Sequence, residues 1–189
     1  MFHPLRIFIA LAVVLFATSG AAVAQSTNDQ DWAKKRALEM IRAHEVPEAT
    51  LPCTPDEAQW WNDLRAAGKA VNASGGRRQE REKFIALLKE GRDKSYQVPI
   101  PDGGARFLWK SEPLYTDEAR NKLIKGSIAM VVELLPDGTV GEARIVQALD
   151  PGLDRNAQEA ARRTVFLPKI KDRKFVASFV PMTMSFDVY

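Results

Sequence analysis

Residues 126–140 read Gly-Ser-Ile-Ala-Met-Val-Val-Glu-Leu-Leu-Pro-Asp-Gly-Thr-Val, and this stretch decides the fold of the C-terminal part of the chain. The large apolar side chains in it alternate, which predicts a strand with one buried face. Pro136-Asp137-Gly138 is a tight-turn sequence, so a second strand is expected to return over residues 139–148. Gly141 lies where the apolar phase of this second strand changes, and it is a candidate β-bulge.

The residues after the hairpin predict one more helix and one more strand. Asp154 is a candidate N-cap for a helix that runs to about Thr164, and its inward face is small, with Ala157, Ala160 and Ala161. A last strand is expected from about residue 174 to residue 188. Pro181 falls inside that strand, and because proline cannot donate to a ladder, it marks an edge strand or a bulge.

The residues before the hairpin predict a short helix that completes the domain. Residues 112–115 are expected to be extended, and Thr116 can cap a helix with Asp117 and Glu118 in its first turn. The order helix, strand, strand, helix, strand predicts an α+β domain, with two packed helices on a small antiparallel three-stranded sheet. The final strand is then exposed along an edge, where another chain can be added.

Residues 25–106 are predicted to be a mostly α-helical, charged region or spacer. Helical spacing runs from about residue 29 to 44, from Thr54 to about Gly68, and from 78 to 92. Thr54-Pro55-Asp56-Glu57 is a capping-box sequence with proline at the first helical position. Trp60 and Trp61 are interpreted as core residues rather than as a ligand site. A cluster of Pro and Gly over residues 99–104 ends the region, and the domain is assigned to residues 107–189.

Residues 1–24 have the three parts of a secretory signal peptide. Arg6 precedes an apolar run over residues 7–17, and Ala22-Val23-Ala24 is a small-residue cleavage sequence. An uncleaved membrane anchor is the alternative, because the apolar segment approaches the length needed to span a bilayer. Both interpretations place the rest of the chain outside the cytoplasm, in the periplasm or on the periplasmic side of the inner membrane.

The composition excludes several kinds of chemistry. Among 189 residues there are two His and one Cys, too few for an internal disulfide or a three-His zinc site. A nucleophilic pair would have to combine Cys53 with His44, and no activating residue is identifiable for it. We therefore predict no enzyme, no catalytic residue, no metal and no cofactor. The net charge of +3 also gives no reason to expect a nucleic-acid partner.

The C-terminal pattern resembles the C-terminal domain of the TonB energy-transducer family. The resemblance depends on the order and spacing of a set of residues between positions 112 and 189: Pro113, Tyr115, Ala119, Gly126, Pro136 to Val140, Ile145-Val146, Leu153-Asp154, Ala160-Ala161, Phe166, Pro168 and Met184 to Phe186. It implies a periplasmic binding module of Gram-negative envelopes. Such a module grips the "TonB box" segment of an outer-membrane transporter by strand addition along its last strand.

Carried over to this sequence, the resemblance implies a set of partner-binding residues. The gripping strand would consist of Phe175, Val176, Ala177, Ser178, Phe179 and Val180, and Pro113 and Tyr115 would belong to the preceding extended motif. Tyr115 is followed by Thr116 where the family usually has proline. The partner is expected to be a transporter segment, which fits TonB-dependent transport, or a second copy of the chain. The membrane is contacted only if the N-terminus is uncleaved.

Two alternatives for the function follow from the same pattern. With residues 7–24 retained as an anchor, the chain would be an energy transducer that couples an inner-membrane motor to outer-membrane transporters. Without a transporter partner, it would be a structural or assembly protein that pairs with its own copy through the edge strand.

Overall fold

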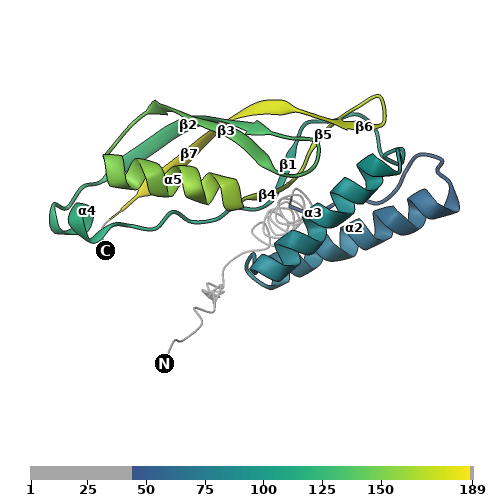
Figure 1. The fold of residues 1–189 in the computed structure, drawn as a ribbon, viewed down its shortest axis with the longest axis horizontal. Coiled ribbons are helices and arrows are strands. Elements are labelled where there is room, and N and C mark those ends of the chain that lie inside the picture. Colours follow the sequence, from purple (N-terminus) through teal and green to yellow (C-terminus); the bar gives the residue numbers. More distant parts are fainter. Residues whose placement is uncertain (1–43, 188–189) are drawn as a thin grey trace, which may run out of the picture. The chain divides into compact units, whose positions relative to one another are not determined.

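The computed structural model describes residues 44–187, so the predicted signal sequence over 1–24 and the predicted helix over 29–44 lie outside or at the margin of the described residues. Figure 1 shows the order of the elements. They are α2 (Pro55–Ala73), α3 (Arg78–Asp93), β1 (Arg106–Trp109), α4 (Asp117–Asn121), β2 (Gly126–Leu134), β3 (Val140–Gln147), α5 (Pro151–Arg163), β4 (Val165–Leu167), β5 (Lys169–Lys171), β6 (Lys174–Val176) and β7 (Ser178–Phe186).

The predicted three-stranded antiparallel sheet is confirmed, with the strand order β3-β2-β7. The register of β2 with β7 is unbroken over nine residues, from Gly126 opposite Phe186 to Leu134 opposite Ser178. The register of β3 with β2 shifts by one residue at two places, and the second shift lies where Val132 pairs with Ala143 whereas Leu134 pairs with Val140. This irregularity includes Gly141, where the change of apolar phase predicted a bulge.

The prediction of a single last strand over residues 174–188 is wrong, because the segments before and after Ala177 pair with different strands. β6 pairs with β5 in a two-stranded hairpin, and β7 pairs with β2. The turn between β5 and β6 contains Asp172 and Arg173 at positive φ, 51° and 59°. A third small sheet joins β1 to β4. Strands of three or four residues leave little periodicity to detect, so β1, β4 and β5 went unpredicted.

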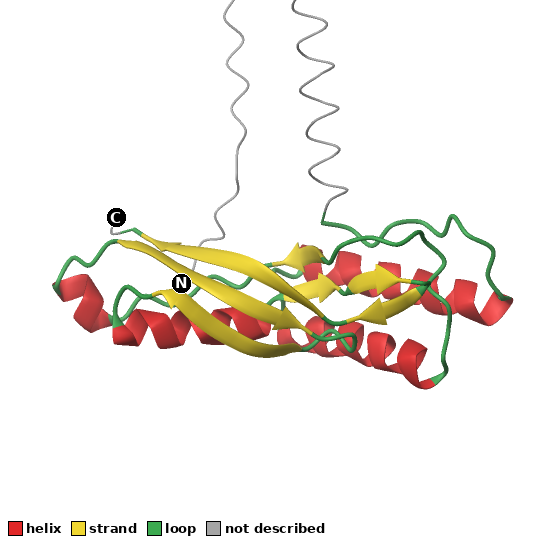
Figure 2. Ribbon diagram, turned by 90° about the horizontal axis from the view of Figure 1, so that it is seen from above, coloured by secondary structure: helices red, strands yellow, loops and turns green. Residues whose placement is uncertain are grey.

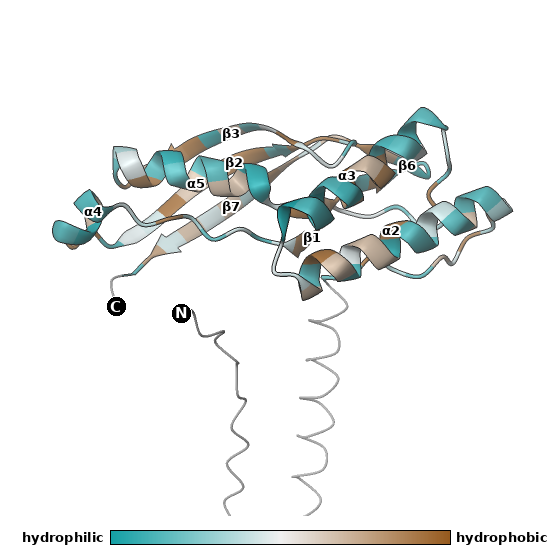
Figure 3. Ribbon diagram, turned by 60° about the horizontal axis from the view of Figure 1, so that its bottom comes forward, coloured by the Kyte–Doolittle hydropathy of each residue, from teal (hydrophilic) through white to brown (hydrophobic). Residues whose placement is uncertain are grey.

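Helix α5 begins four residues earlier than the sequence predicted. Asp150 is its N-cap and accepts hydrogen bonds from the backbone N–H groups of Gly152 (2.8 Å) and Leu153 (3.2 Å), with Pro151 in the first turn. Asp154, the predicted cap, instead accepts a hydrogen bond from the N–H of Leu149 (3.0 Å). The helix lies along one face of the β3-β2-β7 sheet (Figure 2). Its colouring is largely hydrophilic, whereas β2 shows hydrophobic segments (Figure 3).

Helix α2 begins as predicted and ends later than predicted. The capping box is complete, because Thr54 Oγ1 accepts from the N–H of Glu57 and the Glu57 carboxylate accepts from the N–H of Thr54. Gly68 does not end the helix, which continues to Ala73. A Cβ at position 68 would lie 3.1 Å from Val46 Cγ2, so the glycine marks a close approach between segments rather than a helix end.

The described residues contain two hydrophobic cores, which we name the aromatic core and the sheet core. The aromatic core joins α2 and α3 to the short strands and consists of Val46, Trp60, Trp61, Leu64, Ala67, Val71, Phe84, Leu88, Val98, Ile100, Leu108, Val165, Leu167 and Ile170. The sheet core lies between α5, α4 and the β3-β2-β7 sheet and consists of Ala119, Ile128, Met130, Val132, Leu134, Ala143, Leu153, Ala157, Ala160, Ala161, Phe166, Met182, Met184 and Phe186.

Strand β4 connects the two cores. Val165 and Leu167 belong to the aromatic core, whereas Phe166 between them belongs to the sheet core. This is the expected result of alternating side-chain direction in a strand. The helices before residue 106 therefore share a core with strands after it, so a division at the predicted boundary would cut through a common interior.

Candidate functional site: the free edge of strand β7

Strand β7 forms one edge of the three-stranded sheet. It has β2 on one side, and no other strand of the described residues pairs with its second side. Met182, Met184 and Phe186 are buried in the sheet core. The side chains that alternate with them are all exposed: Phe179, Pro181, Thr183 and Ser185. β7 therefore combines a buried face with an unpaired backbone edge.

Pro181 fixes which backbone groups face the free edge. It lies opposite Val131 in the middle of the unbroken register. Because proline has no N–H, it fits here only where its nitrogen points away from β2. Backbone groups alternate in direction along an antiparallel strand, so the N–H groups of Phe179, Thr183 and Ser185 face the free edge as well. The edge therefore offers three donors, with a gap at Pro181.

The side chains of β7 do little to block this edge. Its sequence, Ser-Phe-Val-Pro-Met-Thr-Met-Ser-Phe, has no charged residue, although charges are a common protection of exposed edges. Phe179 is 66% exposed, a large apolar side chain at the beginning of the strand. Ser185 shares a hydrogen bond with Ser127 of β2, with 3.1 Å between the hydroxyl oxygens. The edge is therefore open to another extended segment, and Pro181 alone interrupts it.

Tyr115 lies at the C-terminal end of β7. Its hydroxyl donates a hydrogen bond to the carbonyl oxygen of Ile124, and its ring meets the ring of Phe186 edge to face, with 5.8 Å between the centroids. The Arg120 guanidinium carbon also lies over the Tyr115 ring, 5.9 Å from its centroid. Pro113, two residues earlier, is half-buried. These contacts give Tyr115 a packing role that anchors the segment before α4 to the sheet.

The predicted gripping residues fall into two places. Phe175 and Val176 belong to β6. The Phe175 ring packs against the aromatic core, with its centroid 6.3 Å from that of Trp60 and 6.5 Å from that of Trp61. Ala177 connects the strands, and Ser178, Phe179 and Val180 begin β7. The predicted residues are therefore not brought together, because Tyr115 lies at one end of β7 and Phe175 precedes the other.

Sequence reasoning missed Thr183 and Ser185, which offer donors to the free edge. The signal was present in Pro181, which sets the phase of the whole strand once β7 is treated as an edge. The strand carried over from the family by position begins in β6 and ends in β7, because the change of partner at Ala177 leaves no mark in the apolar pattern.

The candidates for catalysis and metal binding are not assembled into a site. Cys53 is half-buried and lines a hollow with Pro52, Thr54, Glu57 and Gln97, which does not include His44. Within residues 44–187 there is no group of three or more His, Cys, Asp or Glu side chains placed to hold a metal ion. In the same part of the chain, no helix has the length and hydropathy needed to cross a bilayer.

Comparison with known proteins gives a match for the C-terminal part of the chain. Residues 111–188 match the model of the family described as Gram-negative bacterial TonB protein C-terminal. A solution NMR structure of the Pseudomonas aeruginosa TonB C-terminal domain aligns at 21% identity and a TM-score of 0.39, over 47% of this chain and 91% of that one. No curated protein matches the chain. The family match shows that residues 111–188, which include β7 and its free edge, are a TonB C-terminal-like domain.

Proposed function

We propose that the chain is a periplasmic TonB-like binding module that takes up an extended segment of another envelope protein as a fourth strand of its sheet. The added strand pairs with the free edge of β7, giving the order β3-β2-β7-partner. The partner segment is a TonB box of an outer-membrane transporter, which places the module in TonB-dependent transport. The proposal has no catalytic step, because main-chain hydrogen bonds and side-chain fit are sufficient for strand addition.

The open edge of β7 is the observation that carries this proposal. Its nine residues are held in register by β2 on one side, while the other side has no strand of the described residues and no charged side chain. A partner strand would find donors at Phe179, Thr183 and Ser185 and none at Pro181. In any register, the partner carbonyl opposite Pro181 lacks a donor, so the fit of alternate side chains rather than the spacing of donors selects the register.

A pair of substitutions at Thr183 tests the proposal. Thr183→Pro removes an N–H that faces the free edge and leaves the ladder to β2 intact, whereas Thr183→Ala removes the side chain and keeps the N–H. We expect a TonB-box peptide to shift the backbone amide signals of residues 178–186 in the unchanged protein. Affinity should fall about tenfold in Thr183→Pro, the cost of one lost hydrogen bond and one unpaired carbonyl, and change little in Thr183→Ala.

Two results would contradict strand addition at β7. No amide shift in residues 178–186 at millimolar peptide, with the protein folded, contradicts strand addition at this edge. Equal affinities of the two Thr183 variants show that any binding occurs elsewhere. Circular dichroism of both variants serves as the control for folding.

Self-pairing is a second candidate, favoured by the absence of charge along β7. Two copies would then join their β7 edges in one six-stranded sheet. The molar mass in solution distinguishes the candidates: a monomer at all concentrations contradicts self-pairing, and a dimer that Thr183→Pro dissociates supports it. Sequencing of the mature N-terminus tests the anchored alternative, because a chain that begins at Gln25 has no anchor.

A further inference from the structure

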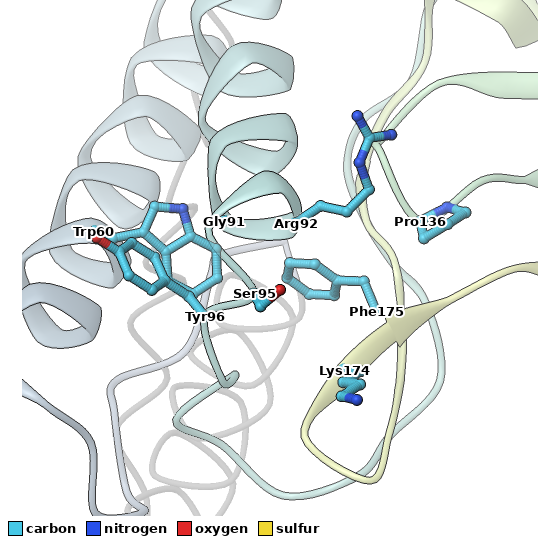
Figure 4. Close-up of a pocket in the computed structure, with 8 residues that line it drawn as sticks. All are labelled: Trp60, Gly91, Arg92, Ser95, Tyr96, Pro136, Lys174 and Phe175. Atoms are coloured by element: carbon cyan, nitrogen blue, oxygen red, sulfur yellow. The ribbon is translucent and has the colours of Figure 1, made fainter.

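A hollow of about 190 Å³ lies where the end of α3 approaches the β5–β6 hairpin and the β2–β3 turn. Figure 4 shows its lining. Trp60, Tyr96 and Phe175 contribute aromatic rings, and Arg92 and Lys174 contribute the cationic groups. No acidic side chain from the described part of the chain lines it. The hollow is distinct from the free edge of β7, and most of its lining comes from residues before position 111.

The walls of the hollow are held in place before any ligand arrives. The Trp60 indole N–H donates a hydrogen bond to the carbonyl oxygen of Leu87 (2.8 Å), which fixes the ring across α3. Gly91 makes this position possible, because a Cβ there would lie 2.1 Å from Trp60 Cζ2. The Tyr96 ring then meets the Trp60 ring with 5.6 Å between centroids. A preformed apolar site loses less conformational entropy when it binds a ligand.

The size of the hollow fits one side chain rather than a whole cofactor. Ligand sites for small molecules commonly measure about 300–1,000 Å³. A volume near 190 Å³ is smaller than that range and suits a single large apolar or aromatic side chain. Aromatic anchors that fill such pockets are frequent centres of protein–protein contacts. A segment of a protein partner is therefore the occupant that this hollow fits.

The charge around the hollow defines the partner further. Lys174 lies directly opposite Lys171 in the β5–β6 pair, and like charges in this position repel. Neither lysine forms an ion pair with any residue between 44 and 187. The Asp102 carboxylate accepts instead from the backbone N–H of Asp172 (3.1 Å). The hairpin therefore has a local excess of positive charge.

The charge of Arg92, in contrast, is compensated by two carboxylates. Its guanidinium lies 2.9 Å from a carboxylate oxygen of Asp93 and 3.8 Å from one of Asp137, and it is about half exposed. Lys94, close to it, pairs with Glu90 and lies over the Tyr96 ring. Within residues 44–187, the cation at the hollow without a carboxylate partner is thus Lys174, and it lies beside Phe175 in Figure 4.

We propose that this hollow is a second docking site, which holds one aromatic side chain of an acidic segment of a protein partner. The aromatic side chain lies among Trp60, Tyr96 and Phe175, and a neighbouring carboxylate pairs with Lys174. This inference goes beyond strand addition and does not depend on it. Because Trp60, Gly91 and Tyr96 precede the family-matched segment, the site gives this chain a partner preference that the matched domain alone does not have.

Amide NMR of the whole protein with three acetylated and amidated peptides tests the site. The probe is Ser-Phe-Glu-Ser-Gly, and its two relatives carry Ala in place of Phe or Gln in place of Glu. The probe should shift the signals of Gly91, Tyr96, Lys174 and the Trp60 indole N–H. Both relatives should bind about tenfold more weakly, since one lacks the anchor and the other lacks the charge.

A charge reversal with a matched control completes the experiment. Lys174→Glu should weaken binding of the probe at least about tenfold, and added salt should weaken binding to the unchanged protein. Lys125→Glu makes the same change of net charge at an exposed position before β2, and it should change the affinity less than about twofold.

Three results would overturn the inference. One is the absence of any shift at these four groups at millimolar probe in a folded protein. The second is equal binding of the probe and the Ala peptide, and the third is an equal effect of the two lysine substitutions. Shifts confined to residues 178–186 would place the probe on the β7 edge, which supports strand addition and contradicts this second site.

Discussion

The two cores of the molecule are built in different ways. The aromatic core brings together side chains from α2, α3 and the short strands β1, β4 and β5, and its largest fully buried side chains are those of Trp61 and Phe84. The sheet core packs the small side chains of Ala157, Ala160 and Ala161 in α5 against the alternating residues of β2 and β7. In the aromatic core, large rings fill the space between the elements. In the sheet core, small alanine side chains allow α5 to lie close to the sheet.

This difference separates what each core does. The sheet core supports β7 from one face and leaves its edge free, so it presents the proposed site for strand addition. The aromatic core holds the helices against the β5–β6 hairpin and supports the walls of the hollow beside Lys174. Because β4 contributes to both cores, the two regions are expected to unfold together in one cooperative transition.

The largest expected effect comes from emptying the aromatic core. Trp61→Ala removes a fully buried ring and the hydrogen bond from its indole N–H to the carbonyl oxygen of Pro47 (2.9 Å), and should lower the free energy of unfolding by about 3–5 kcal/mol. Urea unfolding followed by circular dichroism measures the change. Amide signals of β2 and β7 should be lost at the same urea concentration as those of α2. Sheet signals that survive the loss of the helices would show that the cores are independent.

A smaller effect is expected from filling the close contact in α3. The Cβ of Gly91→Ala would lie 2.1 Å from the Trp60 ring, so the ring must move, at a cost of about 1–3 kcal/mol. Gly104→Ala is the matched control, because no heavy atom lies within 4 Å of the Cβ that it adds. Thermal unfolding of the two variants gives the comparison. A Gly91→Ala protein as stable as the control would show that Trp60 has room to move.

Glu57 at the start of α2 makes the stability of the fold depend on pH in the acid range. Hydrogen bonds from the N–H groups of Gln97 (2.9 Å) and Thr54 (2.8 Å) hold the pKa of Glu57 below its usual range. A lowered carboxyl pKa stabilises the fold above the unfolded-state pKa, and this contribution disappears as the pH falls through the folded-state pKa. Glu57→Gln should therefore cost about 1–2 kcal/mol at pH 7 and progressively less in acid.

Urea unfolding of both proteins at pH 7, 5 and 3 measures this dependence. A difference in stability that stays constant over these pH values would mean that the charge of Glu57 is unimportant.

The start of α5 provides the counterpart in the sheet region, with the smallest effect. Asp150→Ala removes the cap that accepts from the N–H groups of Gly152 and Leu153, and should cost about 1 kcal/mol. Asp150→Asn keeps an accepting oxygen and should recover most of this loss. Chemical unfolding measures the free energy of unfolding of both variants. Equal losses of stability in the two would mean that the carboxylate charge, rather than the cap geometry, stabilises the helix.

The parts predicted correctly from the sequence are those governed by neighbouring residues. Alternation over Ile128 to Leu134, the Pro136-Asp137-Gly138 turn and the capping box at Thr54 depend on contacts within a few positions, and the structure has all three. Asp150-Pro151 repeats the signal of Thr54-Pro55, so the true start of α5 was also present in the sequence.

The parts that were missed depend on pairing between distant residues. β1 and β4 stabilise each other across nearly sixty residues of chain, and neither has enough length to show a period. The division of the last strand at Ala177 follows from which neighbour each half meets, β5 or β2. The hollow beside Lys174 likewise combines residues from α2, α3 and β6, which no local pattern could bring together.

Hydrogen exchange along β7 tests the central claim most directly. In the free protein, the N–H groups of Val180, Met182 and Met184 should exchange slowly, because they face β2, and those of Phe179, Thr183 and Ser185 should exchange quickly. A saturating TonB-box peptide should slow exchange at these last three and leave the first three unchanged. Unchanged fast exchange at Phe179, Thr183 and Ser185 in the presence of bound peptide would contradict strand addition at β7.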